Sequence, residues 1–204
     1  MNMAKRESTF INMVTTLLLV TLIAAAALGF VYDFTRDAIA YAKIEAQREA
    51  IEAILPEFEK IGNPYNVILE SSGDTLEIYP ALKDGEPVGL AVKTFTNKGF
   101  SGHISIMAGI GKSGNFTGYE VLEHSETPGL GAKMEEWFGN TDKPSQCIIG
   151  KNPESHKFEV SKDGGDIDAI TASTITSRAF LDAMVKAYKA YEKGEDKIFG
   201  NAGK

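Results

Sequence analysis

The sequence is poor in the residues from which proteins build metal and thiol centres. Its 204 residues include three histidines and one cysteine, Cys147. One thiol cannot close an internal disulfide, and it cannot supply the several thiolates of a zinc or iron–sulfur site. We therefore expect no metal centre, and we expect Cys147 to be a half-buried thiol without chemistry.

Basic residues are also in the minority. The chain has 21 Lys and Arg against 28 Asp and Glu, which gives a formal net charge of -7. An acidic protein without a basic cluster has no general attraction for the phosphate backbone of DNA or RNA. We expect no nucleic-acid partner.

Charged residues are missing altogether from residues 10–32. At about 1.5 Å per residue, a helix over this run would reach about 34 Å, enough to cross the hydrocarbon core of a membrane. The threonines in the run are tolerable because a threonine hydroxyl can bond back to the preceding turn of a helix. The run predicts one transmembrane helix that contacts lipid and holds the protein in the inner (cytoplasmic) membrane.

Two basic residues, Lys5 and Arg6, precede the apolar run, and mixed charges follow it. This bias favours a cytoplasmic N-terminus, residues 1–9, and a single-pass topology with the soluble part on the outer, periplasmic side. A cleaved signal peptide is the alternative, because a basic start, an apolar run and small residues at positions 24–27 are its ingredients. The length of the run and its helical continuation favour an anchor.

The soluble part begins with a connecting segment, residues 33–63. Apolar and charged residues mix at helical spacing over residues 33–55, which is typical of an amphipathic helix, and Pro56 is expected to end it. After Pro64 the pattern becomes strand-like, with turns rich in Gly, Ser, Asp and Asn. The expected strands are residues 67–69, 76–79, 88–92, 103–107 and 119–122.

Strands so close together in sequence, without helices between them, predict an antiparallel sheet. A short helical run is expected at residues 135–138, and a longer amphipathic helix at residues 175–193, ended by Gly194. The expected fold class is α+β: one N-terminal transmembrane helix, followed by a single domain over residues 64–204 with an antiparallel sheet and flanking helices.

Two segments have more turn and hydroxyl residues than folding requires. In residues 123–133, Pro128 fixes one torsion and the glycines permit positive φ angles, which exposes backbone amides and lets a flat ligand approach. Such a turn is often only a turn.

In residues 171–177 five of seven side chains carry hydroxyls. One or two would serve as a helix N-cap. The same helix start also suits a phosphate, because its unpaired amides and the positive end of the helix dipole face it.

Three segments, in this order behind one transmembrane helix, are similar to those of a known family. They are residues 98–104 (KGFSGHI), 124–131 (HSETPGLG) and 168–177 (DAITASTITS). The chain resembles the FMN-binding G subunit of the Rnf electron-transport complex. The C subunit of the sodium-translocating NADH:quinone reductase is a close relative, but the short length and compact motif spacing favour the former.

The resemblance implies that FMN is bound covalently. In this family a flavin transferase recognises the pattern Asp-X-X-Ser/Thr-Gly/Ala-Ala-Thr and links the phosphate of FMN to the last threonine. Asp168, Thr171 and Ala172 fit the pattern, and Thr174 falls on the acceptor. Glycine is the commoner residue at the position of Ala172. Ser173 stands where the family usually has alanine, which makes it a second, competing hydroxyl.

The resemblance also implies which residues surround the flavin. Backbone amides of the glycine-rich turn would bond the flavin carbonyl oxygens, and Leu130 would cover a face of the ring. No catalytic residue is expected beyond the flavin itself. The expected FMN-binding residues are Thr174, Ser173, Thr171, Thr176, Asp168, Glu126, Thr127, Gly129, Leu130, Gly131, Gly99 and Gly102.

The implied function is electron transfer within a membrane complex that couples electron flow between reduced ferredoxin and NAD to ion translocation. The other Rnf subunits would be its partners. A C-subunit-like component of the sodium-translocating reductase is one alternative. Another is a stand-alone extracytoplasmic flavin reductase, for which His103 and His124 are the plausible proton donors. A third is a non-catalytic anchored binding module in which the turn and the hydroxyls only shape the fold.

Overall fold

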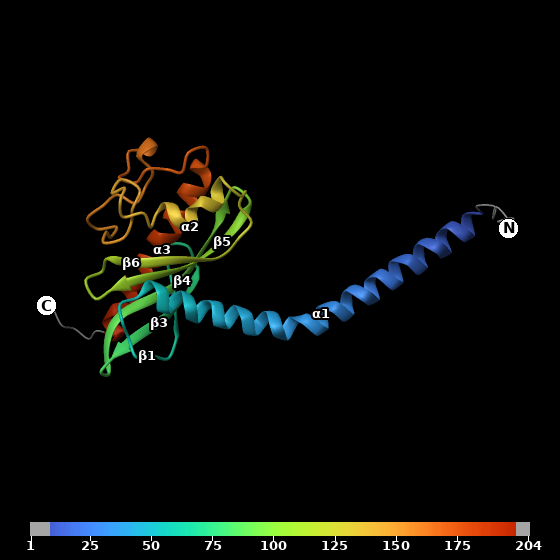
Figure 1. Cartoon of the computed structure of the whole chain (residues 1–204), viewed down its shortest axis with the longest axis horizontal. Coiled ribbons are helices and arrows are strands. Elements are labelled where there is room, and N and C mark those ends of the chain that lie inside the picture. The colour runs from blue at the N-terminus through green and yellow to red at the C-terminus, as the bar shows by residue number, and fades with distance from the viewer. Residues whose placement is uncertain (1–8, 199–204) are drawn as a thin grey trace. The chain divides into compact units, whose positions relative to one another are not determined.

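The computed structural model describes residues 9–198 and has the α+β fold that the sequence predicts (Figure 1). The chain divides into two compact units, Met1–Glu45 and Ala46–Lys204. The elements are α1 (Phe10–Ile54), β1 (Lys60–Ile61), β2 (Tyr65–Ile68), β3 (Thr75–Lys83), β4 (Glu86–Gly99), β5 (Gly102–Gly111), β6 (Phe116–His124), the 3-10 turn η1 (Gly131–Lys133), α2 (Met134–Trp137), the 3-10 turn η2 (Ser161–Asp163) and α3 (Thr174–Ile198).

The first unit is helical from Phe10 onward. The N-terminal part of α1 is long and apolar enough to cross a membrane, as the sequence predicts. The hydroxyls of Thr15 and Thr16 donate to the carbonyls of Ile11 and Asn12 at 2.8 and 2.7 Å. These bonds satisfy the polar side chains within the helix itself, as expected.

The last turns of α1 belong to the second unit and cover one face of its sheet. Ile51 and Ile54 are buried there against Ala91 and Met107. The helix ends at Ile54, in agreement with the prediction that Pro56 terminates it, because a proline disfavours the helical conformation of the residue before it.

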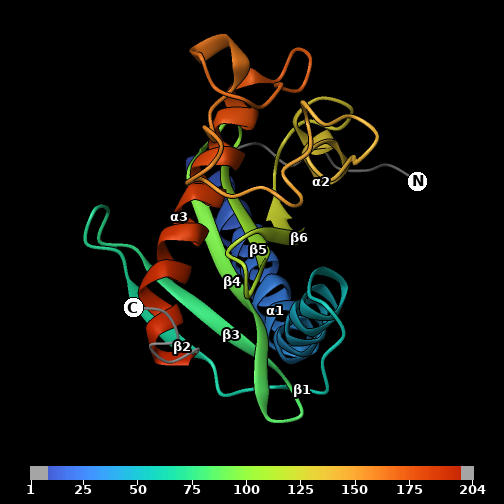
Figure 2. The same cartoon turned by 90° about the vertical axis from the view of Figure 1, so that its left-hand side faces the viewer.

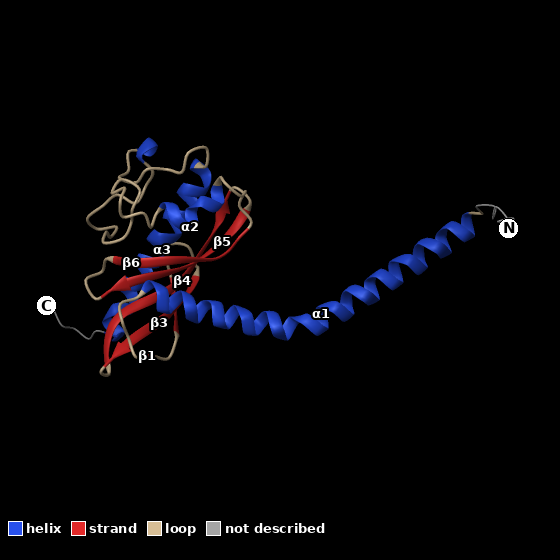
Figure 3. Cartoon of the chain, viewed as in Figure 1, coloured by secondary structure: helices blue, strands red, loops and turns tan. Residues whose placement is uncertain are grey.

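A six-stranded sheet forms the second unit, with the order β1-β3-β4-β5-β6 and β2 paired to β3 (Figure 3). Every pairing between these strands is antiparallel, which confirms the prediction. The central strands β4 and β5 run well past their predicted ends at residues 92 and 107. The two-residue strand β1 was not predicted, because a segment so short shows no alternation.

The other face of the sheet is covered by α3, which lies along β4 (Figure 2). Phe180, Met184 and Ala187 are fully buried on this face, in a core shared with Leu90 and Ile106. Their spacing is that of one helical stripe, which explains why the amphipathic pattern predicted this helix correctly.

The predicted end of this helix is wrong. Helix α3 continues through Gly194 to Ile198. A side chain at position 194 would meet the Tyr65 hydroxyl at 2.6 Å and Ile78 at 2.9 Å. Tyr65 also donates a hydrogen bond to the carbonyl of Gly194 at 3.2 Å. The glycine therefore provides room for β2 and β3 and does not end the helix.

Between β6 and α3 the chain forms a long loop that contains η1, α2 and η2. The Trp137 indole donates to the carbonyl of Asp168 at 2.9 Å, and the Asp168 amide donates to the carbonyl of Ser145 at 2.7 Å. Cys147 in this loop is only 4% exposed, so the expectation of a half-buried thiol is wrong: it is buried. The hydrogen bonds of Trp137 and Ser145 with Asp168 hold the segment that leads into α3.

Candidate functional site

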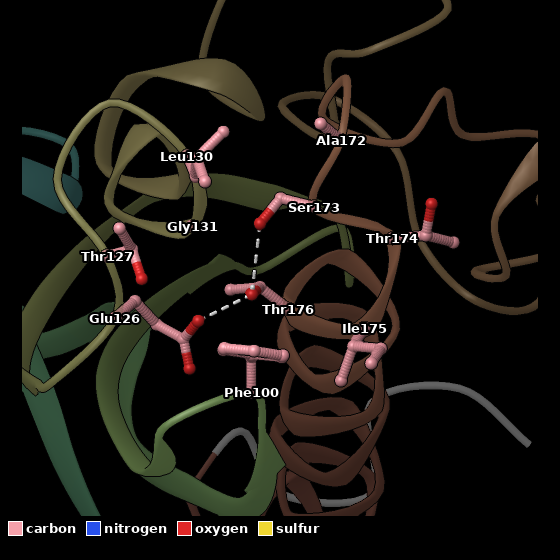
Figure 4. Close-up of a pocket in the computed structure, with 10 residues that line it drawn as sticks. All are labelled: Phe100, Glu126, Thr127, Leu130, Gly131, Ala172, Ser173, Thr174, Ile175 and Thr176. Atoms are coloured by element: carbon pink, nitrogen blue, oxygen red, sulfur yellow. Dashed lines mark hydrogen bonds between the residues drawn. The ribbon is translucent and has the colours of Figure 1, made fainter.

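A pocket of about 350 Å³ lies where three distant segments of the second unit meet (Figure 4). These segments are the turn between β4 and β5, the glycine-rich turn after β6 and the start of α3, the same three that carry the family motifs. The lining residues are Phe100, Glu126, Thr127, Leu130, Gly131, Ala172, Ser173, Thr174, Ile175 and Thr176.

Glu126 joins the three segments. Its side chain is buried, with the residue 5% exposed. One carboxylate oxygen accepts a hydrogen bond from the Ser101 amide at 2.9 Å, and the other accepts from the Thr176 hydroxyl at 2.6 Å. Because each bond comes from a different segment, the carboxylate fixes the β4–β5 turn and the start of α3 against the glycine-rich turn.

Two of the predicted glycines make room for this carboxylate. A Cβ atom at Gly99 would lie 2.7 Å from Oε1 of Glu126, and one at Gly131 would lie 2.5 Å from Oε2. Contacts this short are not found for real side chains, so a larger residue would displace the carboxylate. Gly131 therefore serves the pocket through Glu126, and Gly99 makes room both for this carboxylate and for the carbonyl oxygen of Gly102, 2.5 Å from its would-be Cβ atom. The sequence did not reveal these roles.

The start of α3 presents two adjacent hydroxyls in different environments. Ser173 is 9% exposed, and its Oγ lies 3.3 Å from Oγ1 of the fully buried Thr176. Thr174 is half-buried and is the first residue of the helix. Figure 4 shows the Thr174 side chain directed away from the Ser173–Thr176 pair.

Ala172 has a left-handed backbone conformation, with φ of 62°. An L-residue with a Cβ atom pays about 1–2 kcal/mol for this conformation, whereas glycine adopts it freely. This is a physical reason for the glycine that the family pattern commonly has here. The side chain of Ala172 is exposed, so no packing contact opposes a glycine.

Asp168 lies outside the pocket lining. Its carboxylate accepts a hydrogen bond of 2.8 Å from the Ser161 hydroxyl. Hydrogen bonds from Ser145 and Ser161 hold the pKa of the Asp168 carboxyl below its ordinary value. The structure thus makes the aspartate of the motif an anchor for the loop before α3. Thr171 is exposed on the same loop.

Two further predicted residues, Gly129 and Gly102, also lie outside the lining. Both have positive φ angles, 75° and 102°, and both leave open space around a would-be Cβ atom. They shape the two turns that border the pocket, because a positive φ is costly for other residues.

The two histidines considered as proton donors are engaged elsewhere. Nδ1 of His124 accepts a hydrogen bond of 3.0 Å from the Glu126 amide, and its Nε2 lies 2.9 Å from the Glu135 carboxylate. The ring of His103 stacks on Phe95, and its Nδ1 lies 2.8 Å from Oδ1 of Asn97. His124 thus stabilises the glycine-rich turn through its hydrogen bond with the Glu126 amide.

An apolar rim surrounds the mouth of the pocket. It consists of Phe100, Leu130 and Ile175, which are 68%, 41% and 48% exposed. The sequence singled out Leu130 but missed Phe100 and Ile175. Phe100 could have been noticed in the sequence, because it is a large aromatic residue in a short turn between Gly99 and Gly102. A large exposed apolar side chain adds little to the stability of such a turn, so it suggests a binding role. Such a rim suits a flat aromatic ligand that remains partly open to solvent.

A glycine pattern elsewhere in the chain has a structural explanation. Residues 109–114 (GIGKSG) match the spacing of a dinucleotide-binding fingerprint, but they end β5 and turn into β6. The fingerprint requires a turn from a strand into a helix. A Cβ atom at Gly109 would lie 2.6 Å from the carbonyl oxygen of Ile54, so the glycine here admits α1.

Comparison with known proteins agrees with this geometry. Residues 99–189, which include the whole pocket lining, match the FMN-binding domain family. The G subunit of the ion-translocating oxidoreductase complex of Aliivibrio fischeri (strain MJ11) is 31% identical over 196 residues, covering 89% of this chain and 90% of the relative. The chain belongs to the family of these G subunits.

Other members are similarly close. The corresponding protein of Shewanella amazonensis is 33% identical over 170 residues, which cover 80% of this chain and 79% of the relative. The G subunit of the Na(+)-translocating ferredoxin:NAD(+) oxidoreductase complex of Acetobacterium woodii is 28% identical over 192 residues, 86% of this chain and 88% of the relative. The resemblance inferred from the three motifs is thereby confirmed, and the cofactor of the matched domain is FMN.

Proposed function

We propose that the chain is an electron-transfer subunit of a membrane-bound, ion-translocating ferredoxin:NAD oxidoreductase complex. In this proposal it carries FMN in the described pocket, with the flavin phosphate esterified to Thr174. The observation that carries the proposal is the convergence of all three motif segments on one pocket inside the FMN-binding domain. When bound, FMN supplies the redox chemistry.

The phosphate end of FMN fits the start of α3. This helix is 25 residues long and begins at Thr174, so its unpaired amides and dipole favour an anion there. Thr174 is half-buried, which leaves it within reach of a transferase, whereas the Ser173 hydroxyl faces Thr176 in the interior. This difference supports Thr174 as the attachment site.

The ring end of FMN fits the rest of the pocket. A volume of about 350 Å³ lies within the range of small-molecule sites. Phe100, Leu130 and Ile175 supply apolar surface for the ring, and the turn at Thr127 supplies polar groups near it. These residues would orient the flavin while one edge stays accessible to redox partners.

Attachment of the flavin requires an activated donor, such as a flavin dinucleotide. A bond forms between the acceptor hydroxyl oxygen and the FMN phosphorus, and the pyrophosphate bond of the donor breaks. AMP leaves with the bonding electrons, and the hydroxyl proton passes to a base on the transferase. The chain therefore needs the transferase as a transient partner.

The proposed location is the inner membrane, with residues 10–32 as a single span and the FMN domain, residues 64–204, on the outer side. The apolar part of α1 supports the span. The orientation rests on Lys5 and Arg6 in the cytoplasmic tail of residues 1–9, and both lie outside the described residues. A reporter fused after Lys204 tests this: activity in the cytoplasm would contradict it.

The central experiment is to coexpress the full-length protein with a flavin transferase. Acid-denatured protein is then run on a gel under ultraviolet light, and its intact mass is measured. We expect a fluorescent band and a mass increase of one FMN less one water, and we expect neither in Thr174→Ala. Absence of flavin from the wild-type protein would refute covalent attachment. Copurification of integral membrane partners separates a component of a complex from a stand-alone reductase.

A further inference from the structure

We infer that Glu126, acting through Thr176, makes Thr174 rather than Ser173 the acceptor of the flavin. The inference rests on the proposed function above. It concerns two neighbouring hydroxyls that a sequence pattern alone cannot separate, since a serine beside the acceptor is an equally plausible nucleophile. The contacts beneath the pocket treat the two hydroxyls differently.

The direction of the hydrogen-bond chain is fixed by counting hydrogens. Thr176 has one hydroxyl hydrogen, and it is donated to Oε2 of Glu126 at 2.6 Å. In the 3.3 Å contact between Oγ of Ser173 and Oγ1 of Thr176, Ser173 must therefore be the donor. The Ser173 proton is consequently engaged with Thr176 and is not free to pass to an external base.

Glu126, at the far end of this hydrogen-bond chain, is held in place by its own contacts. Oε1 of Glu126 accepts a hydrogen bond from the Ser101 amide at 2.9 Å, and the carboxylate lies against Gly99 and Gly131. Thr176 is fully buried, so its position follows that of Glu126. The carboxylate thus holds Thr176 in place to accept the Ser173 proton.

The backbone of Ser173 is fixed as well. Its amide donates to the carbonyl of Ile170 at 3.0 Å, and its carbonyl accepts from the Ser177 hydroxyl at 2.9 Å. Turning the Ser173 hydroxyl outward would break its bond to Thr176. The fixed backbone could not shift to restore that bond. Within residues 9–198 the Thr174 hydroxyl makes no such bond. Figure 4 shows the Thr174 side chain directed away from Ser173, Thr176 and Glu126.

The experiment asks whether Ser173 accepts flavin once the chain is broken. Full-length Thr174→Ala and Thr174→Ala/Thr176→Val proteins are each coexpressed with the transferase, and the flavinylated peptide is mapped by mass spectrometry. Valine keeps the volume of threonine but cannot accept the Ser173 proton. We expect Thr174→Ala to remain unlabelled and the double variant to carry flavin on Ser173, because the Ser173 hydroxyl has lost the hydrogen bond that held its proton.

Two further variants keep the test decisive. Thr174→Ala/Thr176→Ser retains a hydroxyl at position 176 and should remain unlabelled. Thr174→Ala/Glu126→Gln covers the case in which Thr176→Val does not fold. The glutamine amide can donate to Thr176, which then donates to Ser173 and frees the Ser173 proton, so we expect labelling at Ser173.

Absence of label from the folded Thr176→Val and Glu126→Gln double variants would overturn the inference and place the selectivity in the transferase. Equal labelling of the Thr176→Ser and Thr176→Val backgrounds would also overturn it, because packing rather than the hydrogen bond would then be responsible. A wild-type protein without flavin contradicts the proposed function itself. A labelled wild type with folded but unlabelled Thr176→Val and Glu126→Gln double variants contradicts only the present inference.

Discussion

The carboxylate of Glu126 accepts a 2.6 Å hydrogen bond from the hydroxyl of Thr176, a residue 50 positions later in the chain. Glu126 belongs to the glycine-rich turn and Thr176 to the first turn of α3. The bond therefore joins the part of the pocket that would contact the flavin ring to the part that would hold its phosphate. The integrity of the pocket depends on this contact.

Glu126→Ala should destabilise the protein by about 2 kcal/mol, because the buried Thr176 hydroxyl loses its acceptor and the site loses a packed side chain. The free energy of unfolding, measured with denaturant on the full-length protein in detergent, checks this. Glu86→Ala is the control, because Glu86 is exposed at the start of β4, and it should leave stability unchanged within about 0.5 kcal/mol. Equal effects in the two variants would contradict the role of Glu126.

Gly131→Ala should cost about 1–3 kcal/mol and reduce the amount of attached flavin, because the new methyl group would occupy the space of the Glu126 carboxylate. Gly129→Ala is the matched comparison. Nothing lies within 4 Å of its would-be Cβ atom, but its φ is 75°. We expect it to cost about 1 kcal/mol through backbone strain alone while flavin attachment persists. Unfolding curves and flavin-to-protein ratios distinguish the two; loss of attachment in Gly129→Ala alone would count against this account.

Ala172→Gly should stabilise the protein by up to about 1 kcal/mol, because relief of the left-handed strain exceeds the gain in unfolded-chain entropy. Ala169→Gly is the control, since Ala169 is not among the described residues with positive φ. There the substitution should destabilise by about 0.5–1 kcal/mol. Thermal midpoints of both variants test the opposite signs, and a loss of stability in both would show that Ala172 is unstrained.

Asp168 should make stability sensitive to acid. Its folded pKa is lowered from an ordinary value of 3.8 by hydrogen bonds from Ser145 and Ser161. The stabilisation is therefore fully present above that ordinary value and is lost as the pH falls through the lowered folded pKa. Melting temperatures of wild type and Asp168→Asn, recorded from pH 6 to about pH 2, should differ near neutrality and converge in acid. A constant difference across this range would contradict the assignment.

Phe100→Ala should leave covalent flavin attachment unchanged but loosen the ring, because it removes an aromatic contact of about 0.5–1.5 kcal/mol. The fluorescence anisotropy of the attached flavin should fall. Ile68→Ala removes another exposed apolar side chain, 62% exposed and outside the pocket lining, and should leave the anisotropy as in wild type. An unchanged value in Phe100→Ala would remove this residue from the ring site.

Local patterns predicted much of the fold. Alternation along β3 and apolar runs in β4 and β5 indicated the sheet, and the apolar stripe of Phe180, Met184 and Ala187 indicated its covering helix. The pattern failed at Gly194, where the reason for the glycine is Tyr65, a residue on a distant strand. The low helix propensity of glycine suggested a helix end at Gly194, and it could not reveal the contact with Tyr65.

The sequence by itself determined the class of the protein. Three motifs in order indicated an FMN-binding family and brought attention to Thr174 and Ser173, because motif residues lie close together along the chain. Only the tertiary structure decided how these motifs meet: it buries Glu126 between Gly99 and Gly131 and links it through Thr176 to Ser173. Such contacts join residues far apart in sequence, and their geometry is set by the packing of the sheet against α3, which no local spacing contains.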